Sequence, residues 1–598
     1  MAKKLEREVL IDVAMGYEPA DTVIVNGQIV NVHTGVIQSD GIAIKGSRIA
    51  ALGDIQYAVG SQTNVIDAGG QYLVPGLIDP HTHQWHTYTN PTVTAACRLL
   101  HGGTAIAEGF YGHAIVNGMK ASRFFLDELL ATPVKAIFLV PTLSYVQNRW
   151  LGLPTSPNAP TMKDLFQALC WPETKGIEEC SYECIVEREH RNPELLQLIE
   201  ECLHQGKVPS GHSSAIYDDR WLNAWAAAGP MDNHEMKSLE EIQRQAELGL
   251  YVMLREGSAC SDIRQVLPFL TERGHASRAC QLCTDVITQD WALERGQVDH
   301  AVRVAINNGL DPIRAIQMST IQPAEYFRVN HDIGVIAPGR FADILFVEHL
   351  SEFQISRVVA NGQVWVEEGK LIGQLNHPIY PDWLYETMNI SRILKAEDFQ
   401  VPAPSGTRST VEVRVITTGD DSLETRESIE TLPVINGVIE ADPGKGINKI
   451  AMIDRIFGTG DMGVAFVKGF NIREGCIGAT ANVFNHNIVL VGTSDQDMAV
   501  AAAEIIKMNG AFIAVRQGKV VAAFPTPLNG IATDLSFDET VKSHNSLMRA
   551  WREMGCSLDS PQSNLEFVTV SSMPLLKISN KGLVYTDGKR CEQVSLVI

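Results

Sequence analysis

Two histidines one residue apart, His81 and His83, follow an apolar run that begins at Val74. Successive side chains of a strand alternate between its two faces, so both imidazoles point the same way and can hold one metal ion between them. Two imidazoles this close repel each other when protonated, unless a metal ion keeps them neutral. The pair therefore outlines a metal site.

Further possible ligands recur along the next two hundred residues, each after a short apolar or glycine-bounded run. They are Glu178, Glu179, His212, His234, Glu235 and Asp285. Any one of these histidines alone would more commonly be a hydrogen-bonded core or surface residue. Together they would meet in a barrel of parallel strands, because the carboxyl ends of the strands lie on one rim. Such a set suits two divalent cations, which make hydroxide available from a shared water near pH 7.

The elements that must position these residues alternate between short apolar strands and amphipathic helices. Residues 134–140 and 250–254 are predicted strands, and residues 194–200 are a predicted helix. This alternation is typical of βα units around a parallel sheet, and about 260 residues is a usual length for a (β/α)8 barrel. We therefore expect an α/β fold with a TIM-like (β/α)8 barrel over residues 75–337.

Strand-rich segments flank this region on both sides. The dipeptides Asn26-Gly27 and Asn361-Gly362 each separate two apolar runs, which is a strong hairpin signal. We expect both hairpins in one small composite β-domain. A Pro- and Ser-containing linker at 401–406 precedes mixed strand and helix, including a predicted helix over 495–508. The expected domains are residues 1–74 with 338–378 (β), 75–337 (barrel) and 379–598 (C-terminal α+β).

Composition limits the classes of function. The formal net charge of −21, from 49 basic and 70 acidic residues, argues against a nucleic-acid-binding surface or an anionic membrane partner. The 11 cysteines are scattered, and no apolar stretch near the start is long enough for a signal peptide or membrane helix. We expect a cytoplasmic enzyme that acts on a small molecule.

Two other motifs do not predict a dinucleotide-binding site or a single-zinc site. The Gly458-x-Gly460-x-x-Gly463 pattern is followed by a strand-like run, whereas a dinucleotide fingerprint requires a helix to begin there. Cys280-x-x-Cys283 is not accompanied by the second Cys-x-x-Cys pair that a zinc ribbon requires. In addition, no histidine is followed two positions later by glutamate. The single-zinc type of nucleobase deaminase is therefore excluded.

Over nearly its whole length, the chain resembles the bacterial adenine deaminase family of the amidohydrolase superfamily. The matching stretches are residues 75–83, 211–212, 232–235, 254–258, 284–285 and 336–343. The resemblance implies hydrolysis of adenine to hypoxanthine and ammonia at a site with two divalent metal ions. Manganese is the metal that it favours, with iron or zinc as alternatives, and a homodimer is the expected assembly.

The resemblance also implies roles for the histidines and acids. His81 and His83 would bind one ion, His212 and His234 the other, and Glu179 would be the bridging acid in place of the carboxylated lysine of related hydrolases. Asp285, also a metal ligand, is the natural base to take the proton of the water and deliver it to departing ammonia.

Five further side chains are open to two interpretations each. Glu235 either shuttles a proton to the ring nitrogen or orients a histidine. Arg255 and Glu256 either bind polar atoms of the substrate or form a buried pair with each other. His86 and His113 either replace missing polar groups of the substrate pocket or are solvent-facing or structural.

The chain departs from the family pattern at residues 84–87, 111–114 and 286 around the pocket, and at residues 483–487 in the C-terminal domain. Acids typical of the family are absent there, whereas the metal-binding residues are kept. Two alternatives to adenine deamination therefore stay open. One is a related hydrolase acting on another amino-heterocycle or a cyclic amide, and the other is a barrel that has lost catalysis and serves as a scaffold.

Overall fold

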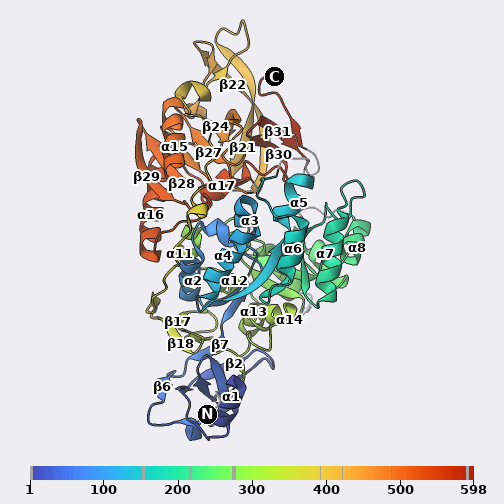
Figure 1. Ribbon diagram of the computed structural model, residues 1–598, viewed down its shortest axis with the longest axis vertical. Coiled ribbons are helices and arrows are strands. Elements are labelled where there is room, and N and C mark those ends of the chain that lie inside the picture. The colour runs from blue at the N-terminus through green and yellow to red at the C-terminus, as the bar shows by residue number, and fades with distance from the viewer. Residues whose placement is uncertain are drawn as a thin grey trace.

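The computed structural model describes residues 5–150, 155–213, 218–236, 238–271, 278–390, 392–420, 422–483, 485–587 and 591–598. Three regions follow one another along the long axis of the molecule, with N-terminal strands at one end, a helix-rich middle and C-terminal strands at the other end (Figure 1). Among the described residues, no helix combines the length and apolar character that a membrane crossing requires.

In the part of the middle region that the structure describes there are eight parallel strands. Five form a sheet in the order β12-β11-β10-β9-β8, and three form a second sheet in the order β13-β14-β15. Their bounds are β8 (Leu77–Asp79), β9 (Gly103–Glu108), β10 (Lys135–Pro141), β11 (Thr174–Ser181), β12 (Val208–His212), β13 (Asp232–Asn233), β14 (Tyr251–Arg255) and β15 (Cys280–Cys283). A parallel bridge between Thr82 and Asp285 joins the segments that follow the first and the last strand. The predicted strands at 134–140 and 250–254 are confirmed as β10 and β14.

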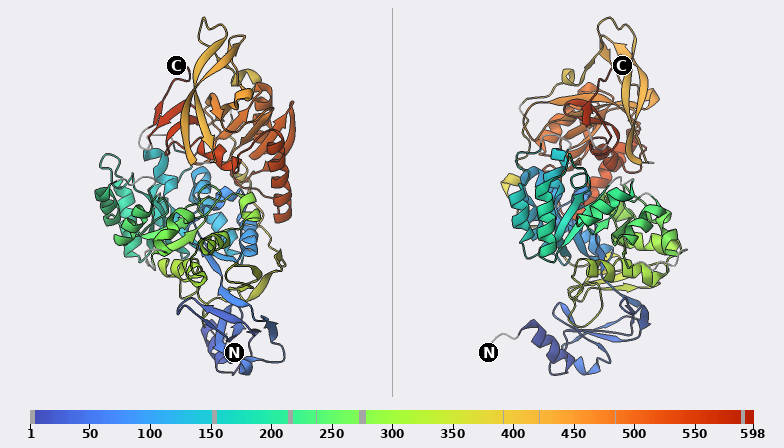
Figure 2. Two further views of the ribbon diagram at one scale, coloured as in Figure 1. Left: turned by 180° about the vertical axis from the view of Figure 1, so that it is seen from behind. Right: turned by 90° about the vertical axis from the view of Figure 1, so that its right-hand side faces the viewer.

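Helices alternate with these strands and lie around them (Figure 2). They are α2 (Pro91–Leu100), α3 (Tyr111–Asn117), α4 (Met119–Leu130), α5 (Leu143–Trp150), α6 (Met162–Leu169), α7 (Pro193–His204), α8 (Asp219–Ala227), α9 (Leu239–Glu247), α10 (Ile263–Thr271), α11 (Gln289–Glu294), α12 (Val298–Asn307), α13 (Pro312–Met318) and α14 (Ile321–Tyr326). The predicted helix at 194–200 is confirmed as α7. Its start is fixed by Asn192, whose side chain accepts from the backbone N–H of Glu194, and by Pro193 in the first turn.

The strands before and after this region share one sheet, in the order β19-β18-β17-β16-β7-β2-β3, and a second sheet has the order β5-β4-β1-β6. The bounds are β1 (Thr22–Val25), β2 (Gln28–Asn31), β3 (Val36–Gln38), β4 (Gly41–Lys45), β5 (Arg48–Gly53), β6 (Asn64–Asp67), β7 (Tyr72–Pro75), β16 (Ile344–Val347), β17 (Ile355–Ala360), β18 (Gln363–Glu367) and β19 (Lys370–Leu371). Helix α1 (Glu6–Ala14) packs on β5. Strand β7 pairs antiparallel with β16, so the chain enters and leaves the middle region at adjacent points.

One of the two expected hairpins is wrong. Asn361-Gly362 connects β17 and β18, which pair antiparallel as predicted. Asn26-Gly27 instead carries the chain from one sheet to the other, because β1 pairs with β4 and β6 whereas β2 pairs with β3 and β7. Both edges of β1 and of β2 are therefore occupied by other strands, and the local turn signal does not decide the pairing.

The C-terminal region is built on a ten-stranded sheet in the order β20-β23-β22-β21-β25-β24-β27-β26-β28-β29. The bounds are β20 (Val401–Pro402), β21 (Thr410–Gly419), β22 (Ser422–Ile435), β23 (Val438–Ile439), β24 (Ile447–Ile453), β25 (Met462–Lys468), β26 (Cys476–Ala479), β27 (Ile488–Gly492), β28 (Ala511–Arg516) and β29 (Lys519–Pro525). The predicted helix at 495–508 is confirmed as α15 (Asp495–Lys507), and α16 (Phe537–Glu553) and α17 (Pro561–Phe567) follow the sheet. A strand, β25, begins at Met462 near the end of the glycine-rich 458–463 segment, where the sequence predicts a strand and not a helix. The expected linker is partly ordered, because Val401 and Pro402 pair with β23.

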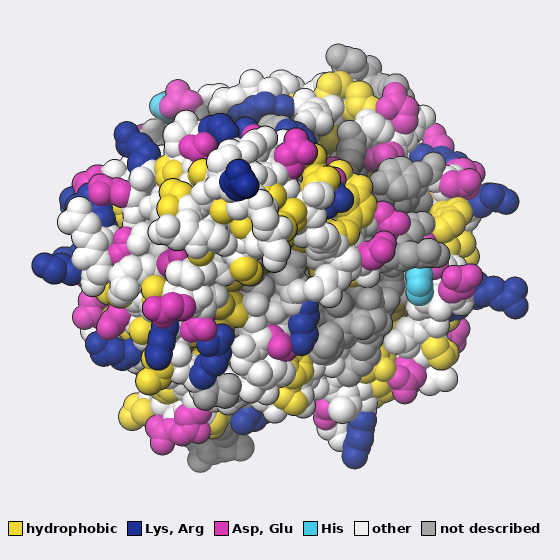
Figure 3. Space-filling view, turned by 90° about the horizontal axis from the view of Figure 1, so that it is seen from above, with side chains coloured by type: hydrophobic (Ala, Val, Ile, Leu, Met, Phe, Trp, Pro, Cys, Tyr) yellow, Lys and Arg dark blue, Asp and Glu magenta, His cyan; other side chains and the backbone are white. Residues whose placement is uncertain are grey.

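Seen from the C-terminal end, the surface carries acidic and basic side chains that are interspersed (Figure 3). A three-stranded sheet of β30 (Leu575–Ser579), β31 (Gly582–Thr586) and β32 (Cys591–Gln593) completes this region. Helix α17 lies where this region meets the middle one, since Glu566 bonds to residues of the segment after β8.

A buried carboxyl on α4 gives the fold a pH dependence. Burial raises the pKa of Glu128 to about 6, although Thr92 and Tyr380 donate hydrogen bonds to it. A carboxyl with a higher pKa in the folded chain binds more protons when folded, so the free energy of unfolding falls as pH rises from about 4.5 to about 6. The free energy of unfolding falls by about 2 kcal/mol over this range. Replacing Glu128 with Gln should remove this pH dependence. Between pH 4.5 and 7 the thermal midpoint of the variant should therefore rise relative to that of the wild type. An unchanged difference between the two midpoints would contradict this.

Candidate active site

The six predicted metal ligands lie together at the carboxyl ends of the parallel strands. They are His81 and His83 after β8, Glu179 in β11, His212 at the end of β12, His234 after β13 and Asp285 after β15. Each comes from a different strand except for the first pair, as expected for a site at this edge of a parallel sheet. We call this group the rim site.

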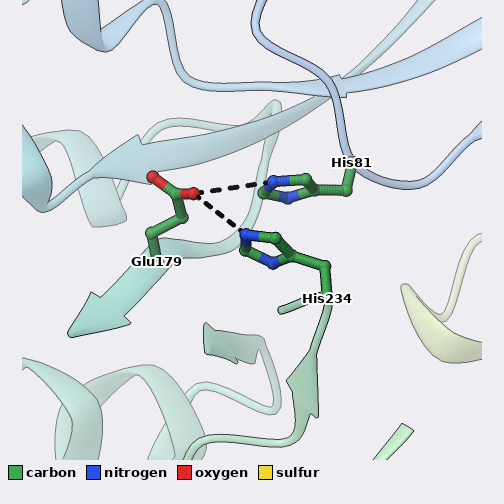
Figure 4. Close-up of side chains that lie close together, drawn as sticks. All are labelled: His81, Glu179 and His234. Atoms are coloured by element: carbon green, nitrogen blue, oxygen red, sulfur yellow. Dashed lines mark ion pairs between the residues drawn. The ribbon is translucent and has the colours of Figure 1, made fainter. Parts of the chain in front are cut away.

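Glu179 occupies the centre of the rim site. Its Oε1 lies 3.5 Å from His81 Nε2 and 3.3 Å from His83 Nε2. The same oxygen lies 3.3 Å from His212 Nδ1 and 3.5 Å from His234 Nε2. Figure 4 shows its approaches to His81 and His234. Ligand atoms about 2.0–2.2 Å from a shared cation are separated from each other by distances of this order. Four imidazoles and one carboxylate oxygen are thus arranged to share cations.

Asp285 joins one half of this group. Its Oδ1 lies 3.5 Å from His81 Nε2 and 3.4 Å from His83 Nε2. His81 Nε2 and His212 Nδ1 are buried and have no hydrogen-bond partner among the described residues. Orphaned imidazole nitrogens beside carboxylate oxygens fit first-row divalent cations. The groups of ligand atoms that lie close enough to hold a cation overlap, since His81 and His83 approach Asp285 while His81 and His234 approach Glu179.

A local irregularity of β11 explains how two consecutive glutamates face the site. The parallel register between β11 and β12 shifts between Ile177 and Cys180, and Glu179 has a left-handed backbone with φ of 45°. In a regular strand Glu178 and Glu179 would point to opposite faces. Instead, Glu178 Oε1 lies 3.2 Å from His83 Nδ1 while Glu179 faces the imidazoles. A φ of 54° at Asp285 marks a second strained position at the same site.

The electrostatics of the site keep both acids ionised. Burial alone would raise the pKa of Glu179, but the neighbouring His83 and His212 outweigh it and hold this pKa well below its usual range. Burial also opposes ionisation of Asp285, whereas His81, His234 and Arg255 hold its pKa well below the usual value. Both carboxyls are therefore in the form that binds cations.

Buried polar networks fix the segments that carry the histidines. Asp79 at the end of β8 accepts from Arg98 Nη1 at 2.8 Å and from Thr284 Oγ1 at 2.6 Å. The backbone N–H of Asp285 donates to the His81 carbonyl at 2.9 Å, which ties the segments after β8 and β15 together. On the other side, Asp232 accepts from the backbone N–H of Gly211 at 2.9 Å and from Tyr326. These bonds hold the ligand-bearing segments in register.

The expectation of a pair between Arg255 and Glu256 is wrong. Neighbouring residues at the end of β14 point to opposite sides, and Glu256 accepts from Ser261 at 2.8 Å. Arg255 donates to Asp262 at 2.6 Å and to Asp285 Oδ2 at 3.1 Å, and it lies 3.4 Å from Glu235. Arg255 thus orients Asp285 rather than pairing with its neighbour. Glu235 lies close enough to His212 and His234 for the three to share a cation.

Two histidines for which a solvent-facing position was one interpretation are buried. His113 in α3 accepts from Asn529 of the C-terminal region at 3.1 Å, and burial lowers its pKa to about 3. His86 lies 2.8 Å from Glu566, also of the C-terminal region. The solvent-facing alternative is excluded for both, because strands and helices far along the chain cover them.

The sequence interpretation overlooked Glu108 and gave no role to Glu178. Glu108 is the last residue of β9 and accepts from the backbone N–H groups of Gln84 and Phe110. Burial and the charge of Glu178 raise the pKa of Glu108 to about 7. Its position at the end of an apolar run is the same signal that identified the other residues. The rim site therefore has a second layer of acids behind His83.

Comparison with known families and proteins identifies similar chains. Residues 72–365 match the model of the amidohydrolase family, and residues 422–590 match that of the adenine deaminase C-terminal domain. The chain is 35% identical over 584 residues to the adenine deaminase of Moorella thermoacetica, with 96% of each chain covered. It is 32% identical over 593 residues to the adenine deaminase of Clostridium botulinum, with 99% of this chain and 97% of that one covered.

Solved structures also align with part of the chain. An adenosine deaminase from Xanthomonas campestris with bound zinc aligns with a TM-score of 0.46 and 15% identity, over 60% of this chain and 95% of that chain. A β-aspartyl dipeptidase from Fervidobacterium islandicum aligns with a TM-score of 0.46 and 17% identity, over 59% of this chain and 99% of that chain.

Proposed function

The chain belongs to the adenine deaminase family of amidohydrolases, and we propose that it hydrolyses adenine to hypoxanthine and ammonia at the rim site. The observation that carries the proposal is the convergence of four imidazoles on one carboxylate oxygen of Glu179. Full-length relatives named adenine deaminase support this substrate over a cyclic amide. The ligand set argues against a scaffold without catalysis.

We propose that His81, His83 and Asp285 hold one divalent ion, that His212 and His234 hold the other, and that Glu179 contacts both. Ions held there would lower the pKa of a shared water toward neutrality. The proximity of the unpartnered nitrogens to Glu179 supports this assignment. Manganese and a homodimer remain predictions from the family resemblance, since histidine and carboxylate ligands also accept iron or zinc.

Proton transfer is assigned to two acids. Asp285 Oδ1 faces the imidazoles while Arg255 occupies Oδ2, so Oδ1 is the atom that takes a proton from the water and passes it to the amino group that leaves as ammonia. Glu235 is partly exposed and lies beside His212 and His234, where it can deliver the second proton to the ring nitrogen. The water oxygen replaces the amino group on the ring carbon, which gives hypoxanthine.

We further propose that the two parallel sheets form one (β/α)8 barrel over residues 75–337, flanked by a β-domain (1–74 with 338–378) and a C-terminal α+β domain (379–598). The Thr82–Asp285 bridge between the first and last strands supports a closed barrel. The eleven cysteines are all free, which favours a reducing compartment and hence the cytoplasm.

Metal removal tests the proposal. The purified protein should bind about two divalent ions per chain, as for a two-ion hydrolytic site. Chelation should abolish ammonia release from adenine, and added Mn²⁺ should restore it. Metal analysis, an ammonia assay and chromatography of hypoxanthine measure the three quantities. A protein that holds two ions and releases no ammonia from adenine would exclude this substrate and direct the search to other amino-heterocycles.

A further inference from the structure

A continuous group of buried rings leads from the rim site to the C-terminal region. The ring of His86 lies 5.9 Å from that of the proposed metal ligand His83, and Trp85 stacks on His86 at 3.7 Å. The edge of Trp85 faces His486 at 5.0 Å. His486 belongs to the segment between β26 and β27, so the C-terminal region forms one wall beside the rim site.

His486 is unusual in three independent respects. It is completely buried, and neither of its ring nitrogens has a hydrogen-bond partner among the described residues. Its backbone is left-handed, with φ of 47°, a conformation that is uncommon for residues other than glycine and that histidine adopts more readily than most. The buried guanidinium of Arg455 donates to its carbonyl oxygen and so holds this conformation. A strained and unsatisfied side chain of this kind indicates a ligand.

The chemistry of His486 is that of a neutral imidazole. Burial, reinforced by the nearby charge of Arg455, holds its pKa well below the usual range. One ring nitrogen therefore donates a hydrogen bond and the other accepts one. Adenine presents N–H donors next to ring-nitrogen acceptors, and a neutral imidazole can pair with either.

His86 is held in one orientation by the C-terminal region. Its Nδ1 lies 2.8 Å from Glu566 Oε2, and the hydroxyl of Tyr88 donates to Glu566 Oε1 at 2.7 Å. A carboxylate that accepts from Nδ1–H fixes the tautomer, so that Nε2 is left as an acceptor. Glu566 is completely buried and belongs to α17, 480 residues away in the chain.

Two more buried polar atoms of this group lack partners among the described residues. They are Trp85 Nε1 and His113 Nε2, both on the barrel side. A Cβ at Gly112 would lie 2.8 Å from the Trp85 ring, so this glycine permits the close packing that places the ring here. Several unsatisfied donors and acceptors beside flat rings match a planar heteroaromatic base.

We propose that His486 and His86 bind the heteroaromatic base, so that the substrate site is shared between the barrel and the C-terminal region, with Glu566 as a positioning residue that acts through His86. The inference rests on the proposed function for the identity of the base. It adds a role in substrate recognition for a segment that contributes no ligand to the rim site.

Replacing His486 with Asn tests the first part, because asparagine tolerates the left-handed backbone and leaves the wall intact. The matched control is His544→Asn, since His544 is equally buried in the C-terminal region but bonds to Gln562. Binding of hypoxanthine to each metal-loaded protein is measured by calorimetry, with KM and kcat for adenine and metal content alongside. His486→Asn should weaken hypoxanthine binding and raise KM by about tenfold or more. The control should change neither.

A double-mutant cycle tests Glu566. Glu566→Gln should lower kcat/KM by about 10–100-fold with the metal content unchanged. Glu128→Gln is the matched control, because Glu128 is also buried and bonded to a tyrosine hydroxyl. Adding Glu566→Gln to His86→Gln should cost little more, since both changes remove the same interaction. Additive losses would show a merely structural role and overturn the assignment of Glu566.

The outcomes separate this inference from the proposed function. Equal hypoxanthine binding by wild type and His486→Asn overturns the inference and leaves adenine deamination intact. Weakened binding in the variant, without ammonia release by the wild type, supports the inference and refutes the adenine deaminase activity. A wild-type holoenzyme that binds neither hypoxanthine nor adenine refutes both.

Discussion

Replacing Glu179 with Gln is expected to abolish adenine deamination, with a loss of at least about 10³-fold, because the group that all four imidazoles approach would lose its charge. An amide can neither balance two cations nor contact both through one anionic oxygen. We expect fewer than two bound ions per chain after dialysis. Metal analysis and ammonia release measure the two effects on the same preparation.

Glu128→Gln again serves as the control, since it removes a buried carboxyl far from the histidines. It should retain both ions and wild-type activity. A Glu179→Gln protein with two tightly bound ions and more than a tenth of the wild-type rate would show that Glu179 is not the shared ligand.

The second large effect is expected at Asp285. Asp285→Asn should bind both ions, because His81, His83 and Glu179 remain, but should lose about 10²–10⁴-fold in kcat as the proton acceptor disappears. An amide oxygen keeps the shape of the side chain and the bond to Arg255. The expected result is therefore a fall in kcat with little change in hypoxanthine affinity.

Asp262→Asn is the matched control for this change, because Asp262 also bonds to Arg255, at 2.6 Å, but is not among the residues that approach the imidazoles. It should change kcat by less than about tenfold. Equal losses in the two variants would mean that Asp285 acts only by holding Arg255, and the assignment of the base would fail.

The rule that polar residues at the ends of apolar strands meet at one edge brought together the histidines, Glu179 and Asp285 from the sequence alone. The same rule applied to residues 103–108 would have included Glu108. The rule also included Glu178, but it could not show how two consecutive side chains face one site, since that depends on a register shift in β11. Neither the alternation of a regular strand nor local propensity contains that information.

The contacts of His86 and His113 could not be predicted from the sequence for a different reason. His86 and His113 bond to Glu566 and Asn529, which lie 480 and 416 residues further along the chain. Asn26-Gly27 shows the same limit, because its local conformation is compatible with a hairpin and only the competing strands exclude one. Local signals specify elements, whereas distant contacts decide which elements become neighbours.

The pairing of β7 with β16 has a consequence for synthesis of the chain. Strand β7 ends at Pro75 and β16 begins at Ile344, so about 270 residues must be translated between these two partners. At about 5–20 residues per second the ribosome needs roughly 14–54 s for this interval. During that time the first sheet strands have an unpaired edge, and a chaperone that shields such edges would have its main opportunity to act on this protein.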